Sequence, residues 1–222
     1  MHHARDQALH RLWSLRFGLS VPIEAALELL KLPYRVEECS PWESEEQADK
    51  LRTINPMIQV PALVLPSGRL MTESAAILIW LADNTPEGRL APALSDPARG
   101  EFLRWMTFVS SAVYALYWIA DNPSRVLERP EDHEEIRARL FERIARCWAF
   151  MGNQLRPGRY LLGQELSVLD LYVATASRWS PGRRRFNEVA PSLADAVSRV
   201  DADPRLASLW SHRYPFAPGW ER

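Results

Sequence analysis

Glu73 and Ser74 are residues whose types and position suggest chemistry, because the apolar run that follows them predicts a helix over Ser74–Ala82. Free N–H groups and the helix dipole favour a carboxylate at a helix N-terminus. The Ser74 hydroxyl would add a donor, and the Glu73 carboxylate could accept from an α-ammonium group. The pair could therefore hold an amino-acid zwitterion. Taken alone, it fits a structural role better, with Thr72 or Ser74 capping the helix and Glu73 in its first turn.

A second candidate is the Val60-Pro61 peptide, which comes directly before an apolar run typical of a buried strand. A cis peptide costs least at an X-Pro bond. In the cis form, the N–H and C=O of Val60 would point away from the strand ladder and could pair with an extended peptide ligand. A trans proline as the first residue of a strand is the alternative. The spacing alone does not separate the two.

A third candidate set lies on a long, mostly apolar helix predicted over residues 98–120. Polar and aromatic side chains recur on it at helical spacing and form one stripe: Arg104, Thr107, Ser111, Tyr114 and Trp118. Such a stripe either faces a cleft or packs against another helix, as in a dimer interface. In a cleft, Tyr117 and Trp118 would make the site wide and aromatic, suited to an apolar ligand.

The composition excludes several classes of function. A net charge of −1 gives no electrostatic reason to expect nucleic acid or an anionic membrane as a partner. Cys39 and Cys147 are far apart, which excludes a dithiol redox pair and a cysteine metal cage. We expect no metal site, and place His2 and His3 in a flexible terminus. No apolar run approaches ~20 residues, and the N-terminus lacks the apolar core of a signal peptide. We therefore expect a cytoplasmic protein.

The pattern of elements predicts an α/β domain followed by an all-α domain. Strand, helix and turn signals alternate in the first part, whereas only helices are expected in the second, over 98–120, 131–150, 167–178 and 191–200. The predicted boundaries are 8–84 for the first domain, 85–97 for a proline-rich linker and 98–222 for the helical domain. Ser167 and Asp170 predict a capping box, and the basic run at 178–186 predicts a solvated loop.

The run NPMIQVPAL, followed by TESAAILIWLAD, resembles the glutathione-binding half of the cytosolic glutathione transferase family, of bacterial type and unclear class. LELLKLPY and YLLGQELSVLDLYVA extend the likeness to roughly residues 10–212. The resemblance implies an N-terminal thioredoxin-like domain joined to an all-helical domain, glutathione as co-substrate, and a homodimer. It also implies a cis Pro61, with the Val60 backbone on the cysteinyl part of glutathione and Glu73, Ser74 and Gln59 at its γ-glutamyl end. Ile58 departs from the family, which usually has a glycine there.

The residue that would activate the thiol is not at its usual place. A free thiol has a pKa of about 8.5, so a nucleophilic thiolate needs a hydrogen bond or a positive charge. The family supplies a Tyr, Ser or Cys after the first strand, but the matching positions fall near Trp13 and Phe17. The candidates nearby are Ser20, Ser14 and Arg16. Ser20 is favoured because it stands at a predicted helix N-terminus, although it could simply cap that helix.

The sequence therefore predicts a glutathione transferase that directs the glutathione thiolate at an apolar electrophile. By the resemblance, Thr107, Ser111 and Tyr114 match positions that touch glutathione in some bacterial members, and Trp118 would line the electrophile site. A glutathione-dependent isomerase, lyase or dehalogenase is possible on the same scaffold. A non-catalytic module that binds glutathione or protein is the alternative of a different class.

Overall fold

The computed structural model describes residues 9–15, 18 and 20–215 of the 222-residue chain. The chain divides into two compact units. The first runs to Ala91 and also includes Asp203–Pro215, and the second begins at Pro92 and continues to Ala202. This division differs from the predicted boundary of 98–222, because a C-terminal segment groups with the α/β part of the chain.

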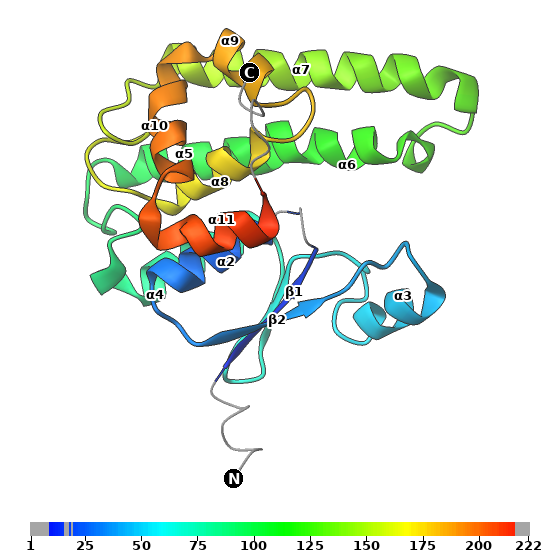
Figure 1. Ribbon diagram of the computed structural model, residues 1–222, viewed down its shortest axis with the longest axis horizontal. Helices are drawn as coiled ribbons and strands as arrows, with labels where there is room; N and C mark the ends of the chain where they lie inside the picture. Colours follow the sequence, from blue (N-terminus) through cyan, green and yellow to red (C-terminus); the bar gives the residue numbers. More distant parts are fainter. Residues whose placement is uncertain (1–8, 16–17, 19, 216–222) are drawn as a thin grey trace. The chain divides into compact units, whose positions relative to one another are not determined.

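The first unit is a thioredoxin-like α/β domain, as the sequence predicted (Figure 1). Its four strands lie in the order β2-β1-β3-β4, with β1 parallel to β2 and antiparallel to β3, and β3 antiparallel to β4. The elements are β1 (His10–Ser14), α2 (Val21–Leu29), β2 (Tyr34–Glu38), α3 (Glu45–Arg52), β3 (Ala62–Val64), β4 (Leu70–Met71), α4 (Ser74–Asn84), η1 (Pro86–Gly88), η5 (Pro204–Leu206) and α11 (Ala207–Arg213).

The first strand ends at Ser14, and Arg16 and Phe17 lie outside the described residues. Apolar positions explain how these elements assemble: Leu12 of β1 is fully buried, as are Ile23 and Leu27 of α2. Pro22 stands in the first turn of α2, where the missing N–H costs no hydrogen bond. The strongly polar α3 forms because Ser44 caps it, with its hydroxyl accepting from the Gln47 N–H at 3.2 Å.

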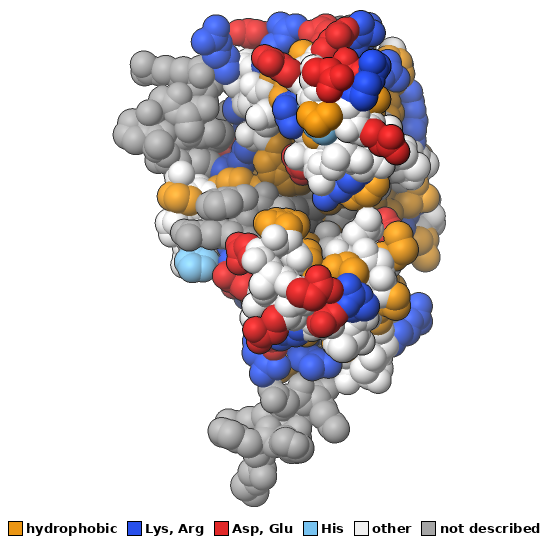
Figure 2. Space-filling view, turned by 90° about the vertical axis from the view of Figure 1, so that its right-hand side faces the viewer, with side chains coloured by type: hydrophobic (Ala, Val, Ile, Leu, Met, Phe, Trp, Pro, Cys, Tyr) orange, Lys and Arg blue, Asp and Glu red, His pale blue; other side chains and the backbone are white. Residues whose placement is uncertain are grey.

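The second unit consists of helices and turns, apart from one isolated bridge between Tyr160 and Gly163 among its described residues. Its helices are α5 (Arg99–Phe108), a π-helix (Val109–Tyr114), α6 (Ala115–Asp121), η3 (Pro123–Arg125), η4 (Pro130–Asp132), α7 (His133–Gln154), α8 (Val168–Ala176), α9 (Arg183–Val189) and α10 (Pro191–Asp201). No helix in the described part of the chain is long and apolar enough to span a membrane. Acidic and basic side chains are interspersed on the face shown in Figure 2, in keeping with the net charge of −1.

The helix predicted over 98–120 is interrupted by the π-helix. A π-turn holds one residue more than an α-turn, so the part after it is rotated by about 100° relative to a continuous α-helix. The rotation lets Val109, Val113 and Tyr117 all point into the core. The Cys147 thiol on α7 donates to the carbonyl oxygen of Ala112 at 3.3 Å, inside the π-helix.

The capping box at the start of α8 is confirmed. Asp170 is buried, and its carboxylate accepts from the Ser167 N–H at 2.9 Å and from the Ser167 hydroxyl at 2.7 Å. It also accepts from the Leu161 N–H at 2.7 Å, which ties the preceding turn to the helix. Burial raises the pKa of Asp170 to about 6, against these three donors, which lower it.

The prediction of a solvated basic loop at 178–186 is wrong for two of its four arginines. The side chains of Arg184 and Arg185 are exposed, on α9. Those of Arg178 and Arg183 are buried, and both pair with Asp201 at the end of α10, with 2.7 Å between Arg183 Nη1 and Asp201 Oδ2. Arg183 also donates to the Ala174 carbonyl oxygen at 2.7 Å. The local sequence shows only the positive charges, whereas the carboxylate that accounts for their burial lies about twenty residues further on.

Candidate functional site

The two candidate pairs lie at the same end of one strand pair. Leu63 pairs with Met71 and Val64 with Leu70 in the antiparallel register of β3 and β4. In an antiparallel pair, the start of one strand lies beside the end of the other. Val60 and Pro61 directly precede β3, and Glu73 and Ser74 follow β4 after one residue, so both pairs belong to this end of the first unit's sheet.

The Val60-Pro61 peptide is cis, as the resemblance implied. Because β3 begins only at Ala62, Val60 lies beyond both strand ladders, and its side chain is half-buried. Gln59 is exposed beside it. This segment can offer backbone groups and one amide side chain to an extended ligand.

Glu73 is the residue that precedes α4, and Ser74 is the first residue of the helix. Thr72 and Ser74 therefore do not cap the helix. The Glu73 backbone has φ 65° and ψ 103°, and its side chain is exposed and makes no capping hydrogen bond. Such a conformation costs of order 1–3 kcal/mol in a residue other than glycine. The exposed Glu73 carboxylate therefore lies directly before the N-terminus of α4, where the N–H groups of the first turn have no partner within the helix.

The sequence interpretation gave no role to Asn55, which holds the loop before Val60. Its side chain is buried, with Nδ2 donating to the Gln59 carbonyl oxygen at 2.8 Å and Oδ1 accepting from the Met57 N–H at 3.1 Å. The Asn55 carbonyl also accepts from the Ile58 N–H at 2.8 Å. The available signal was the Asn-Pro pair, which is typical of a turn.

Ile58 lies in the same loop with φ 53°, in the left-handed region. A β-branched residue is rarely found there. This explains why a glycine would suit the position. The isoleucine side chain packs against a buried cluster that includes Trp13, Leu51 and Val64. Packing therefore offsets the backbone cost.

The two serine candidates for thiol activation are buried. Ser14 is fully buried at the end of β1, and its hydroxyl donates to the Leu15 carbonyl oxygen at 3.1 Å. Ser20 precedes α2 and is also fully buried. Its hydroxyl makes no capping hydrogen bond and has no partner among the described residues, so it does not act as a side-chain cap. Arg16 lies outside the described residues.

The predicted polar stripe is exposed along most of its length but is not one straight row. Arg104, Thr107 and Ser111 are exposed, and the Ser111 hydroxyl donates to the Thr107 carbonyl oxygen at 2.8 Å. The π-helix rotates Tyr114 and Trp118 away from this line. The ring centroid of Tyr114 lies 5.8 Å from that of Trp179. The guanidinium of Arg125 lies 4.7 Å from the centre of the Trp118 ring.

Tyr117 does not belong to this surface. Its side chain is buried, and its hydroxyl donates to the Ala176 carbonyl oxygen at 3.2 Å. Burial raises the pKa of Tyr117, so the phenol stays protonated and remains a donor. The prediction that Tyr117 lines a cleft is wrong because the residue joins α6 to the end of α8.

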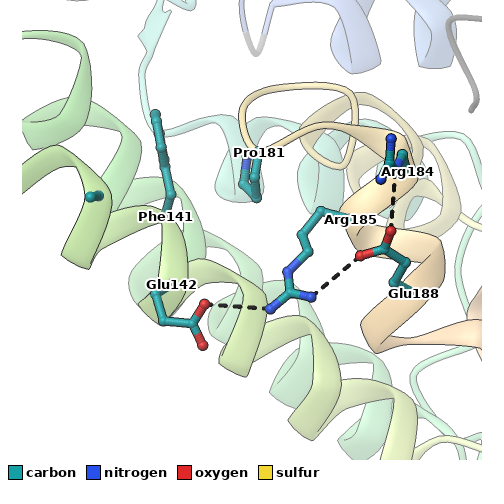
Figure 3. Close-up of a pocket in the computed structure, with 7 residues that line it drawn as sticks. Phe141, Glu142, Pro181, Arg184, Arg185 and Glu188 are labelled. Carbon is teal, nitrogen blue, oxygen red and sulfur yellow. Dashed lines mark hydrogen bonds and ion pairs between the residues drawn. The ribbon is translucent and has the colours of Figure 1, made fainter.

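A separate groove of about 440 Å³ lies between α7 and α9 of the second unit (Figure 3). Arg185 points between Glu142 and Glu188, at 3.4 and 3.3 Å, and Arg184 lies 3.2 Å from Glu188. Phe141 and Pro181 form an apolar side of the groove. The charges cancel within the groove, and it contains none of the predicted site residues.

Comparisons with known proteins show the family to which the chain belongs. The family model for the glutathione S-transferase N-terminal domain matches residues 20–84. The uncharacterized GST-like protein YncG of Escherichia coli K12 is 30% identical over 187 residues, which are 84% of this chain and 89% of that protein. Glutathione S-transferase GstA of Escherichia coli O157:H7 is 27% identical over 166 residues, covering 75% of this chain and 79% of that enzyme.

A solved structure is similar over nearly the whole chain. The glutathione transferase homologue from Sulfitobacter, solved with bound glutathione, has a TM-score of 0.82 at 25% identity. The match covers 91% of this chain and 97% of that one. The chain belongs to the cytosolic glutathione transferase family.

Proposed function

We propose that this protein is a glutathione transferase, which binds glutathione in its first unit and directs the thiolate at an apolar electrophile. The observation that carries the proposal is that Val60 and Pro61 precede β3 while Glu73 and Ser74 follow β4, at the same end of this antiparallel strand pair. Glutathione is an extended tripeptide with an amino-acid zwitterion at one end. One edge of the domain thus offers a partner for its backbone and a partner for its zwitterion.

Each residue of the candidate site binds one part of glutathione or holds the site in place. The Val60 N–H and C=O bind the cysteinyl part, as a short case of strand addition. The Glu73 carboxylate accepts from the α-ammonium group, while the Ser74 hydroxyl and the N–H groups at the start of α4 bind the α-carboxylate. Gln59 lies beside them. Pro61 and Asn55 hold this edge in place.

The electrophile is assigned to the helical unit. Thr107, Ser111, Tyr114 and Trp118 would contact it or the bound glutathione. The similarity to the family supports this assignment. On the same ground, we propose that the protein is a homodimer in the cytoplasm. The exposure of Thr107 and Ser111 leaves their hydroxyls accessible.

A glutathione-binding protein without transferase activity is the second candidate. The burial of both Ser14 and Ser20 favours it, because neither hydroxyl is accessible to a bound thiol as the segment is folded. Under this alternative, glutathione would bind with an ordinary thiol pKa near 8.5 and would not be activated.

Retention on immobilised glutathione tests binding. A hydrogen-bonded charged group contributes roughly 1.5–3 kcal/mol, so Glu73→Gln should weaken binding about 10- to 100-fold. Ser74→Ala should weaken it less. Glu46→Gln is a matched control, because Glu46 is also an exposed acid at a helix start, that of α3. Failure of the unchanged protein to bind, or equal retention by all variants, would remove the proposal.

Conjugation of a chloronitroaromatic then separates the two candidates. A transferase should turn over this substrate, and Ser20→Ala or Ser14→Ala should lower the rate at neutral pH with little change in glutathione binding. Turnover that survives both substitutions would exclude these hydroxyls as activators. Glutathione binding without turnover would support the non-catalytic protein.

A further inference from the structure

The groove between α7 and α9 has walls that buried contacts hold in place. Arg183 of α9 is buried and pairs with Asp201. One turn later, the buried Phe186 ring lies edge-on to Trp148 of α7, with 5.3 Å between the ring centroids. These contacts join the inner face of α9 to the rest of the second unit. The opposite face of α9, which carries Arg185, therefore lines the groove in a fixed position.

The groove has an apolar side and a charged side (Figure 3). Phe141 of α7 and Pro181, which precedes α9, form the apolar side. On the charged side, acidic and basic residues alternate in a row: Glu142, Arg185, Glu188 and Arg184. The volume of about 440 Å³ falls within the range of roughly 300–1,000 Å³ that is usual for small-molecule sites. The groove can therefore hold a small molecule that has both an apolar and a charged part.

The ion pairs of this charged row are long and open to solvent. Their N–O distances are 3.2, 3.3 and 3.4 Å, whereas charge-assisted hydrogen bonds usually measure about 2.7–2.9 Å. The side chains of Glu142, Arg185 and Glu188 are 55%, 41% and 46% exposed. Because exposed ion pairs contribute little to stability, a ligand can replace one of them at a small cost.

The balance of charges in the row decides which ligand it suits. A simple anion would meet the carboxylates beside each guanidinium, and a simple cation would meet the guanidiniums beside each carboxylate. An α-amino acid carries an ammonium and a carboxylate group on one carbon atom, so its two charges are close together, like neighbouring charges of the row. Each can then lie beside a group of opposite sign. An apolar side chain on the same carbon atom would pack against Phe141 and Pro181.

We propose that this groove is a second ligand site, which binds a small zwitterion with an apolar side chain, such as an apolar amino acid. The carboxylate of the ligand accepts from Arg185, its ammonium group donates to Glu142 or Glu188, and its side chain packs against Phe141. The site lies within the second unit and shares no residue with the edge of the first unit assigned to glutathione. The inference is therefore independent of the proposed function.

The test is a titration of the full chain, followed by nuclear magnetic resonance, with three ligands of the same aromatic ring. L-Phenylalanine carries both charges, 3-phenylpropionate lacks the ammonium group, and 2-phenylethylamine lacks the carboxylate. Phenylalanine should shift the amide signals of residues 138–142 and 184–188. Each analogue that lacks one charge should bind at least about fivefold more weakly.

Variants with matched controls test the two sides of the groove. Arg185→Gln and Phe141→Ala should each weaken phenylalanine binding about fivefold. Arg139→Gln is the control for the charge, because Arg139 is an exposed arginine of α7 that pairs with Glu135. Phe150→Ala is the control for the ring, because Phe150 is an exposed phenylalanine of the same helix. Both controls should bind phenylalanine as wild type does, and glutathione affinity should be unchanged in all four variants.

Three outcomes would overturn the proposal. The first is that phenylalanine shifts no signals of the groove, or only signals outside it. The second is equal binding of phenylalanine and its two analogues, which would show that the charged row does not recognise a zwitterion. The third is unchanged phenylalanine binding in Arg185→Gln, whose fold is checked by thermal unfolding. None of these outcomes depends on whether the protein binds glutathione.

Discussion

Each unit contains a buried cluster of arginine and acidic side chains, and the ratio of arginines to carboxylates is reversed between the two clusters. In the first unit, one guanidinium contacts two carboxylates, and in the second, Asp201 pairs with two guanidiniums. The second cluster ties the segment after α8 to the end of α10, with the Ala174 carbonyl at the negative end of α8 supplying a further partner. The first cluster, of Arg213, Glu24 and Glu38, joins α11 to α2 and β2 within the first unit. In both units, buried arginine and acidic side chains therefore join separate elements, whichever charge is in excess.

The largest effect is expected for Asp201→Asn, which removes the carboxylate that the two buried guanidiniums of Arg178 and Arg183 share. Breaking a buried ion pair from one side costs about 3–5 kcal/mol of unfolding free energy. Denaturant unfolding should show this loss, while glutathione affinity at temperatures where the variant is folded should be unchanged. Asp195→Asn is the control, because Asp195 is exposed on the same helix and should change stability by under about 0.5 kcal/mol. Equal losses of unfolding free energy in the two variants, or a loss of glutathione binding in Asp201→Asn, would contradict a purely structural role for Asp201.

The buried Asp170 makes the stability of the second unit depend on pH. Its pKa is about 6 in the folded protein, raised from an ordinary 3.8, so the folded state binds this proton more tightly than the unfolded chain. Its contribution to stability is therefore fully present below pH ~4 and is lost as the pH rises through about 6. The difference in unfolding free energy between wild type and Asp170→Asn should fall by about 3 kcal/mol across this window. A difference that stays constant with pH would contradict this account.

The smallest effect is expected at Ile58, beside the candidate site. Ile58→Ala loses packing and keeps the left-handed backbone, whereas Ile58→Gly loses packing but relieves a strain of roughly 1–2 kcal/mol. Glycine usually destabilises a protein relative to alanine, but here the glycine variant should be the more stable by about 1 kcal/mol. Thermal unfolding of both variants tests the order. A glycine variant that is less stable than the alanine variant would show that the backbone at Ile58 carries no strain.

Local patterns suggested the first candidate site but not the clusters. A proline before a strand and an acid before a helix left Val60 and Glu73 open to a structural role as well as to ligand binding, and the resemblance to the family favoured glutathione. The capping box of Ser167 and Asp170 was predictable for the same reason. By contrast, Arg213 and Glu24 are 189 residues apart, and no periodicity links them. The π-helix was not predictable either, because its register depends on which side chains pack from α7.

Calorimetric titration of glutathione into wild type, Glu73→Gln and Glu46→Gln tests the central claim most directly. The claim is that the edge formed by Val60 and Glu73 binds glutathione. The account predicts that wild type and Glu46→Gln bind with the same affinity and that Glu73→Gln binds about 10- to 100-fold more weakly. Equal affinity for all three proteins, or no binding by wild type, would contradict it.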